Sequence, residues 1–251
     1  MTEKATLDNA DQPRTVAATD YAGIELLYAA ESCLPGYNAD IVKKIAAALA
    51  ASDQVLEFGA GLGTLAALYR DQTGRRPECL EIDPTLKKVL TDRGFVCYES
   101  TASIPGKFDG VYTSNVLEHI EDDVAALREI NRVLQDDGVL VIYVPAFRVL
   151  FSDLDRAVGH VRRYRLRELE QKLAAARFSV TRAFYVDSIG FFASLALRIF
   201  GFKEDDALRS KRSLQTYDRY IYPLSSLLDS CGLKHVLGKN VFVVARKVAA
   251  A

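Results

Sequence analysis

Residues 55–65 read Val-Leu-Glu-Phe-Gly-Ala-Gly-Leu-Gly-Thr-Leu, and this stretch decides the fold. A short apolar run leads into three glycines at alternate positions, Gly59, Gly61 and Gly63, after which apolar residues recur at helical spacing. This order predicts a buried strand, a tight turn and a helix. Glycine permits positive φ angles and lets a ligand approach the backbone closely, and the first N–H groups of a helix are free to bind it. The stretch is therefore a candidate ligand-binding turn, with a purely structural strand–helix connection as the alternative.

The spacing of the glycines and the acid that precedes them distinguish between the classes of nucleotide-binding protein. A dinucleotide fingerprint requires G-x-G-x-x-G, whereas this chain reads G-x-G-x-G and carries Thr64 where the third glycine would stand. Glu57 lies two residues before the first glycine. This Glu-x-Gly-x-Gly-x-Gly arrangement resembles motif I of the class I S-adenosylmethionine-dependent methyltransferases. The resemblance implies that Glu57 lies near the methionine end of S-adenosylmethionine and that the three glycines give this cofactor access to the backbone.

The overall composition bounds the class of protein. At 251 residues, with 49% hydrophobic and 26% charged residues, the chain is long enough for a sizeable core, and its length predicts one globular domain or two small ones. A net charge of -1 and a pI near 6.3 argue against a protein that binds nucleic acid through overall basicity. The four cysteines lie apart with no C-x-x-C pair, so we expect neither a metal centre nor a disulfide framework.

No segment predicts export or a membrane span. Residues 1–19 are polar and unpatterned, so we expect a disordered tail rather than a signal peptide. No run approaches the ~18 apolar residues that a transmembrane helix requires. These features predict a cytoplasmic protein with a single folded domain over residues 20–251.

The second predicted strand, residues 78–82, brings another acid to the end of a strand. Asp83-Pro84 follows it as the N-cap and first residue of a helix. Glu81 therefore lies where a carboxylate binds ribose hydroxyls in nucleotide-binding βαβ units; the alternative is a surface acid beside the helix. Asp83 already supplies the cap, which leaves Glu81 without a structural task and favours ribose binding. Leu-Glu-Ile-Asp also resembles the second motif of the methyltransferases, which implies that Glu81 and Ile82 contact the cofactor.

Two further strand ends place polar residues at the same edge of the sheet. Residues 96–99 predict a third strand followed by Ser100-Thr101, and residues 109–114 predict a fourth strand followed by Asn115. In the resembled family the loop after the third strand borders the adenine, often through an acid. Ser100 or Thr101 stands in that place here, and Asn115 completes the predicted cofactor site.

The middle of the chain extends the resemblance. The string Phe-Asp-Gly-Val…Asn-Val-Leu-Glu-His-Ile…Arg-Val-Leu-Gln-Asp-Asp-Gly-Val-Leu is similar to small-molecule class I methyltransferases. Strands alternating with helices at this interval predict a Rossmann-like α/β fold, doubly wound, with helices on both faces of a mostly parallel sheet. The resemblance implies seven strands, the last of them (residues 240–245) antiparallel and inserted between the fifth and sixth. Ligands bind beyond the carboxyl ends of such strands, where the predicted cofactor residues converge.

A helix before the first strand is predicted from residue 38 onwards. Asn38 follows the Pro35-Gly36 break and suits the N-cap of a helix whose buried face begins at Ile41. Methyltransferases of the resembled family often place such a segment over the cofactor pocket, which is the alternative role of Tyr37-Asn38.

Residues 146–165, after the fifth strand, are irregular and predict a lid or substrate-binding insertion. Five arginines and no acid occur between residues 156 and 167. One interpretation is a solvated basic face; the other is an electropositive lid that binds an anionic acceptor, because arginine holds phosphate or carboxylate bidentately. The string Asp-Arg-Ala-Val-Gly-His-Val-Arg-Arg-Tyr resembles a segment of bacterial methyltransferases of sugars or lipid-linked saccharides. The resemblance implies that Arg162, Arg163 and Tyr164 bind the substrate.

An apolar helix over residues 188–202 begins a predicted helical cover that extends to residue 232. Its length is too short to span a bilayer. We expect it to pack on the core or to cover the substrate. Basic neighbours such as Arg198 leave a membrane-surface helix, and so peripheral membrane contact, as the alternative.

Two histidines are candidate catalytic residues. In methyl transfer the enzyme mainly aligns acceptor and methyl group, and a base is needed only when the acceptor must lose a proton. His119 follows the fourth strand and His160 lies in the basic segment, so either imidazole is a candidate base. The alternative for each is a capping or packing role.

The sequence thus predicts S-adenosylmethionine-dependent methyl transfer to a small or lipid-linked acceptor, such as a sugar or saccharide hydroxyl or carboxylate. A dinucleotide-dependent oxidoreductase, the main enzymatic alternative, would carry glycine at position 64. An enzyme that methylates amino groups of nucleic acids usually carries Asn/Asp-Pro-Pro-aromatic after the fourth strand, where this chain reads Ser-Asn-Val-Leu. A non-catalytic cofactor-binding module of the same fold stays open, because fold does not fix function.

Overall fold

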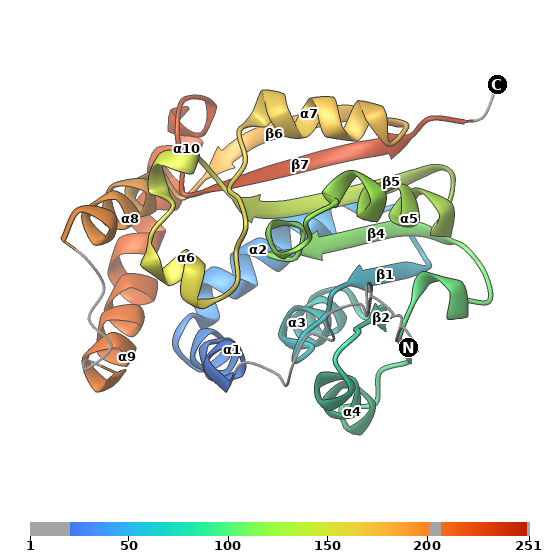
Figure 1. Ribbon diagram of the computed structural model, residues 1–251, viewed down its shortest axis with the longest axis horizontal. Helices are drawn as coiled ribbons and strands as arrows, with labels where there is room; N and C mark the ends of the chain where they lie inside the picture. Colours follow the sequence, from blue (N-terminus) through green and yellow to red (C-terminus); the bar gives the residue numbers. More distant parts are fainter. Residues whose placement is uncertain (1–20, 201–206, 250–251) are drawn as a thin grey trace, which may run out of the picture.

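A computed structural model describes residues 21–200 and 207–249 (Figure 1). The predicted disordered tail, residues 1–19, lies outside the described residues. Seven strands form one sheet in the order β3-β2-β1-β4-β5-β7-β6. Strands β1 to β5 pair in parallel, and β7 pairs antiparallel with β5 on one side and β6 on the other. The predicted Rossmann-like fold and the inserted antiparallel last strand are confirmed.

The strands are β1 (Val55–Phe58), β2 (Glu78–Leu80), β3 (Cys97–Tyr98), β4 (Phe108–Ser114), β5 (Leu134–Pro145), β6 (Phe178–Val186) and β7 (Asn240–Lys247). The helices are α1 (Tyr21–Cys33), α2 (Pro35–Ala48), α3 (Thr64–Thr73), α4 (Pro84–Asp92), α5 (Asp123–Val133), α6 (Asp153–Ala157), α7 (Leu166–Ala175), α8 (Ser188–Phe200), α9 (Ala207–Thr216) and α10 (Tyr222–Ser230). Short 3₁₀ turns, η1 (Thr101–Ser103), η2 (Leu117–His119) and η3 (Arg148–Leu150), follow β3, β4 and β5.

Two helical layers bury the central strands. Helices α2, α3 and α4 pack on one face of the sheet, and α5 and α7 pack on the other. All four residues of β1 are buried, as expected of a parallel strand covered on both faces. The apolar positions of α5 and α7 that recur every three or four residues supply the second face of the core; Leu127, Ile130, Leu169 and Leu173 are fully buried there.

The start of α2 differs from the sequence prediction. Asn38 is not the N-cap: the helix begins at Pro35, and the Asn38 side chain donates to the carbonyl of Ala30 at 3.1 Å. The cap comes from Asp218, whose carboxylate accepts the N–H groups of Gly36 and Tyr37 at 3.0 and 2.7 Å. Proline is tolerated in the first turn because its missing N–H needs no partner there.

The carboxyl ends of the parallel strands form one edge of the sheet, and several residues at this edge have strained backbone conformations. In Figure 1 the arrowheads of β1, β4, β5 and β6 point to the side on which α6, α8 and α9 lie. Three non-glycine residues just after strands at this edge have positive φ: Asn115 (54°), Phe147 (57°) and Asp187 (68°). Such conformations cost about 1–3 kcal/mol each and are typical of functional sites.

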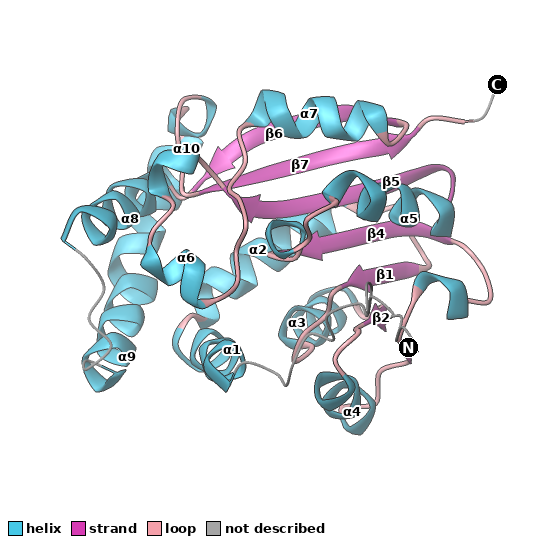
Figure 2. Cartoon of the chain, in the orientation of Figure 1, coloured by secondary structure: helices cyan, strands magenta, loops and turns pink. Residues whose placement is uncertain are grey.

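The connection from β5 to α7, residues 146–165, crosses this edge mainly as loop with the short α6 in its middle (Figure 2). Ala146 forms an isolated bridge with Tyr164, so the segment leaves and returns at the same place. Among residues 21–200 and 207–249, no helix combines the length and apolarity needed to cross a bilayer.

Candidate active site

The glycine turn lies between β1 and α3, as predicted. Gly59, Gly61 and Gly63 have φ angles of 76°, 55° and 77°, which only glycine adopts without strain. A Cβ atom on Gly59 would lie 2.5 Å from Val116, and one on Gly63 2.6 Å from Leu90. Gly61 differs, because a Cβ atom there would meet only Leu27 of α1, at 3.7 Å. The outer glycines therefore pack against the protein, whereas Gly61 presents open backbone beneath α1.

Glu81 lies directly beside this turn. Its carboxylate accepts the N–H of Gly61 at 2.8 Å on one oxygen and the N–H of Asp83 at 3.0 Å on the other. The expectation that Glu81 lacks a structural task is therefore wrong, because it joins the end of β2 to the glycine turn. Asp83 caps α4 as predicted, accepting the N–H groups of Thr85 and Leu86.

Glu57 lies under the turn and is nearly inaccessible to solvent. The hydroxyl of Tyr112 donates to its carboxylate at 3.0 Å. Burial raises the pKa of Glu57 to about 8, against the hydrogen bond from Tyr112, which lowers it. The pKa of this carboxyl group therefore lies close to neutral pH.

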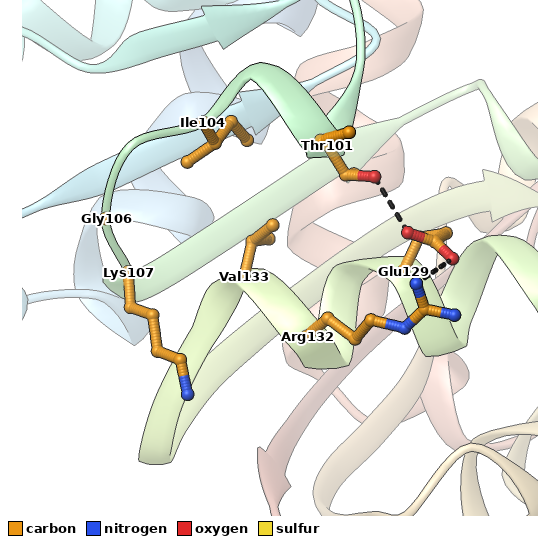
Figure 3. Close-up of a pocket in the computed structure, with 8 residues that line it drawn as sticks. Thr101, Ile104, Gly106, Lys107, Glu129, Arg132 and Val133 are labelled. Atoms are coloured by element: carbon orange, nitrogen blue, oxygen red, sulfur yellow. Dashed lines mark hydrogen bonds and ion pairs between the residues drawn. The ribbon is translucent and has the colours of Figure 1, made fainter.

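Three further predicted cofactor residues differ in exposure: Ile82 and Ser100 are exposed, and Thr101 is half-buried. Ile82, directly after Glu81, is 79% exposed, which is unusual for a large apolar side chain. Ser100 is exposed and begins the η1 turn. Thr101 is turned away: its hydroxyl donates to Glu129 of α5 at 2.7 Å and lines a hollow of about 220 Å³ between η1 and α5 (Figure 3). Of the predicted cofactor residues, only Thr101 lines that hollow.

The two candidate catalytic histidines, far apart in sequence, lie side by side. The rings of His119 and His160 meet edge to face with their centroids 4.6 Å apart. Although part of His119 reaches solvent, burial of its ring and the neighbouring His160 lower its pKa to about 4, so the imidazole is neutral at pH 7. The histidine pair lies near the glycine turn, because Val116, which follows β4 and lies three residues before His119, packs against Gly59.

A buried acid that the sequence analysis did not single out completes this group. Glu118 is fully buried, and neither of its carboxylate oxygens has a hydrogen-bond partner. Burial raises its pKa to about 8. Its Oε1 lies 3.8 Å from Nε2 of His160, while Nδ1 of His160 lies 2.8 Å from Oδ1 of the buried Asp155. The only sequence signal was an acid inside an apolar run, Asn-Val-Leu-Glu-His-Ile.

The three residues predicted to bind the substrate hold the basic segment in place. Arg163 pairs with Asp155 at 2.8 Å, and Arg162 pairs with Asp123 at 2.8 Å. Tyr164 is fully buried, and its hydroxyl donates to Asp123 at 2.8 Å. Arg162 and Arg163 are therefore not free cations in this structure, and their contact with an acceptor stays a prediction. The other three arginines of the basic segment, Arg156, Arg165 and Arg167, are exposed, as the solvated-face interpretation expects.

Asn115 lies at the edge itself. It is exposed, with the left-handed backbone noted above, and its side-chain amide donates to the Ser114 hydroxyl at 3.3 Å. Its N–H donates to the carbonyl of Tyr143, which fixes the end of β4 against β5. The structure thus brings the glycine turn, Glu81, Ile82, Asn115 and the histidine pair to one edge.

Comparison with known proteins identifies the family. A model of the methyltransferase domain matches residues 31–183, which is more than half of the chain. No curated protein matches the sequence.

Solved structures share the fold at low sequence identity. One, provisionally assigned as a sarcosine dimethylglycine methyltransferase from Galdieria sulphuraria, is 20% identical with a TM-score of 0.55, over 84% of this chain and 85% of that one. The [4+2]-cyclase SpnF is 19% identical, with a TM-score of 0.54 over 84% and 81%. The mycolic acid cyclopropane synthase CmaA1, complexed with SAH and CTAB, is 14% identical, with a TM-score of 0.51 over 82% and 84%.

The family match covers the glycine turn, the second strand and the histidine-bearing segments, so the site and the family agree. This chain belongs to the methyltransferase domain family and is an S-adenosylmethionine-dependent methyltransferase.

Proposed function

We propose that this enzyme methylates an oxygen of a small or lipid-linked acceptor at the carboxyl edge of the sheet. The observation that supports this most is the histidine pair, His119 and His160, which lies at the edge that also carries the glycine turn. An imidazole pair next to the methyl donor suits an acceptor that must lose a proton, such as a hydroxyl group.

The residues present fit the adenosyl part of the cofactor. Each oxygen of the Glu81 carboxylate accepts one backbone N–H and keeps a free lone pair for a ribose hydroxyl. The exposed Ile82 offers an apolar surface to a flat base. Gly61 leaves backbone open to close approach. We therefore assign the ribose to Glu81, the base to Ile82 and Ser100, and the methionine end to the glycine turn above Glu57 and to Asn115.

When bound, S-adenosylmethionine supplies an activated methyl group. The protein then has to hold the acceptor oxygen in line with that group, at roughly 3–3.5 Å, and to exclude water. Segment 146–165 and the described part of the cover, residues 188–200 and 207–232, lie at the edge where the acceptor would enter, and we propose that they enclose it. His119 or His160 would withdraw the proton of the acceptor.

The surface of the cover favours an acceptor with an apolar part. Phe192 of α8 and Leu224 and Leu227 of α10 are each more than half exposed, and α8 packs against α10. A lipid-linked saccharide would place its chain on this surface and its hydroxyl or carboxylate group at the histidine pair. The saccharide itself rests on the resemblance of the basic segment to sugar-modifying enzymes.

The test begins with the cofactor. S-adenosylhomocysteine is titrated calorimetrically into the wild-type protein, Glu81→Ala, and the matched variant Glu99→Ala, whose exposed acid pairs with Lys87 at 2.9 Å. Hydrogen bonds to a charged group contribute about 1.5–3 kcal/mol. We expect Glu81→Ala to weaken binding at least about 10-fold and Glu99→Ala to leave it unchanged; equal affinities would contradict the ribose assignment.

The acceptor is then sought by release of S-adenosylhomocysteine from S-adenosylmethionine with small hydroxylated compounds and lipid-linked saccharides. Turnover with an oxygen acceptor, reduced in His119→Ala while cofactor affinity is kept, supports the proposal. Tight cofactor binding without turnover on any oxygen acceptor would contradict the proposal.

A further inference from the structure

We propose that Glu118, His119 and His160 form a binding site for a divalent first-row transition-metal ion. One ligand atom from each residue lies within 4.8 Å of the other two. Two imidazole nitrogens and one carboxylate oxygen are a ligand set that suits Zn²⁺, Fe²⁺ or Mn²⁺. The expectation of no metal centre came from cysteine spacing alone, which does not bear on a site built from histidine and glutamate.

The first argument is the unpartnered carboxylate. Glu118 is fully buried, and neither oxygen accepts a hydrogen bond. A buried polar group without a partner costs free energy and calls for an explanation. Nε2 of His160, at 3.8 Å from Oε1, is too distant to be that partner. A cation between the carboxylate and the two rings would satisfy it.

The second argument is the orientation of the histidines. Nδ1 of His160 lies 2.8 Å from Asp155, which directs Nε2 toward Glu118. Asp155 is itself fixed by Arg163 at 2.8 and 3.1 Å and by the N–H of Ser152 at 2.8 Å. A carboxylate behind an imidazole, as Asp155 lies behind His160, is the arrangement that orients histidine ligands of metals.

The third argument is space and access. Ligand atoms at ~2.0–2.2 Å from an ion lie ~3–3.5 Å from one another. The three groups lie within 4.8 Å of one another, so they need to close by at most about 1.5 Å. Glu118 is buried and His160 half-buried, but His119 reaches solvent, which gives the ion a way in. Three protein ligands leave at least one coordination position open.

The open position suggests how the site would serve the enzyme. An ion there would bind the acceptor oxygen and lower its pKa, a role that rests on the proposed function. His119 and His160 would then serve as ligands of the ion rather than as bases, and the proton of the acceptor hydroxyl would pass to solvent water on the exposed side of His119. The ion would also join η2 to segment 146–165, because the ligands come from both.

Metal binding is tested without cofactor or acceptor, so that its failure is distinct from failure of the proposed function. The chelator-treated protein is titrated with Zn²⁺ and with Mn²⁺ by calorimetry. We expect one ion per chain, bound at least 10-fold more weakly by Glu118→Gln and by His160→Ala. The control is His235→Ala, the remaining histidine of the chain, which lies on the exposed η6 turn and should bind as the wild type does.

Two results would overturn the site: a wild-type protein that binds neither ion, or variants that bind as tightly as the wild type. Circular dichroism checks that the variants fold. A second measurement needs no variant: the Co²⁺-loaded wild-type protein should show weak d–d bands, whereas an intense thiolate charge-transfer band would place the ion on cysteine and refute the proposal.

Discussion

Glu57 is an ionisable side chain held where ionisation costs free energy. Its carboxyl group lies under the glycine turn, nearly inaccessible, with the Tyr112 hydroxyl as its side-chain partner. Burial raises its pKa from 4.5 to about 8. The folded state therefore keeps a proton that the unfolded chain loses above about pH 4.5, so this residue makes stability fall as pH rises from about 4.5 to 8.

Glu57→Gln should remove this dependence, because the amide keeps the shape and an acceptor for Tyr112 but does not titrate. We expect the variant to gain stability relative to the wild type between pH 5 and pH 8, by about 1.4 kcal/mol for each unit of effective pKa shift. Urea unfolding at both pH values measures it, with Glu170→Gln, an exposed acid on α7, as control. Parallel wild-type and variant stabilities across the range would refute it.

At the scale of single residues, the sequence located side chains whose position follows from local structure. Glu81 follows a strand and precedes a capped helix, so its place at the edge was predictable, although its bonds to Gly61 and Asp83 were not. Glu118 was missed, because its isolation depends on burial by segments distant in sequence. Asp155 was missed for the same reason, since its partners become visible only when residues 146–165 fold back.

At the scale of elements, two glycines on either side of α3 allow the effect of backbone conformation to be distinguished from the effect of ligand access. Gly61 and Gly74 both have positive φ, at 55° and 74°, at the two ends of the same unit, and neither has a close neighbour where a Cβ would stand. An alanine at either position should therefore cost a similar amount, about 1–2 kcal/mol of stability. Only Gly61 faces the proposed cofactor site.

We predict that Gly61→Ala weakens binding of S-adenosylhomocysteine at least about 10-fold, while Gly74→Ala leaves it unchanged. Calorimetric titration gives the affinities, and thermal unfolding confirms that both variants lose comparable stability. If the two variants bind equally well, the turn is a structural connection and the close-approach argument fails.

Element boundaries were predictable where their signals are local. Strands β4 and β7 lie within two residues of the bounds expected from the sequence, 109–114 and 240–245, and Asp83 caps α4 as expected. The apolar runs and the Asp-Pro pair that indicate them each lie within a few residues. The start of α2 was wrong because Asp218, which caps it, lies 182 residues from Gly36. No pattern of neighbouring residues indicates a capping partner so distant in the sequence.

At the scale of the whole molecule, Asp123 joins three segments. It is 2% exposed and accepts from Lys172 of α7 at 2.8 and 2.9 Å, and from Arg162 and Tyr164 of segment 146–165 at 2.8 Å each. The residue itself is the first of α5. It therefore holds segment 146–165, and with it the partners of the histidine pair, against the sheet.

The charge of Asp123 should be needed for this junction. Burial alone would raise its pKa, but the hydrogen bonds from Lys172 and Tyr164 hold the pKa below its ordinary value. Its contribution to stability is therefore present above about pH 4 and is lost as pH falls. Asp123→Asn removes the carboxylate that pairs with the partly buried Arg162 and leaves Lys172 only the more distant Glu168, at 3.9 Å. We therefore expect a loss of about 2–4 kcal/mol at pH 7.

Denaturant unfolding at pH 7 and at pH 3 tests both the size and the sign of this effect. The stability difference between wild type and Asp123→Asn should shrink at pH 3, because below about pH 4 the unfolded wild-type chain takes up the proton that the folded state resists. Asp136→Asn is the control, because Asp136 is exposed and pairs with Lys247 at 3.4 Å, a contact worth about 0–1 kcal/mol. A difference at pH 7 no larger than that of the control, or one that stays the same at pH 3, would mean that packing rather than this ionised carboxylate holds the segment on the sheet.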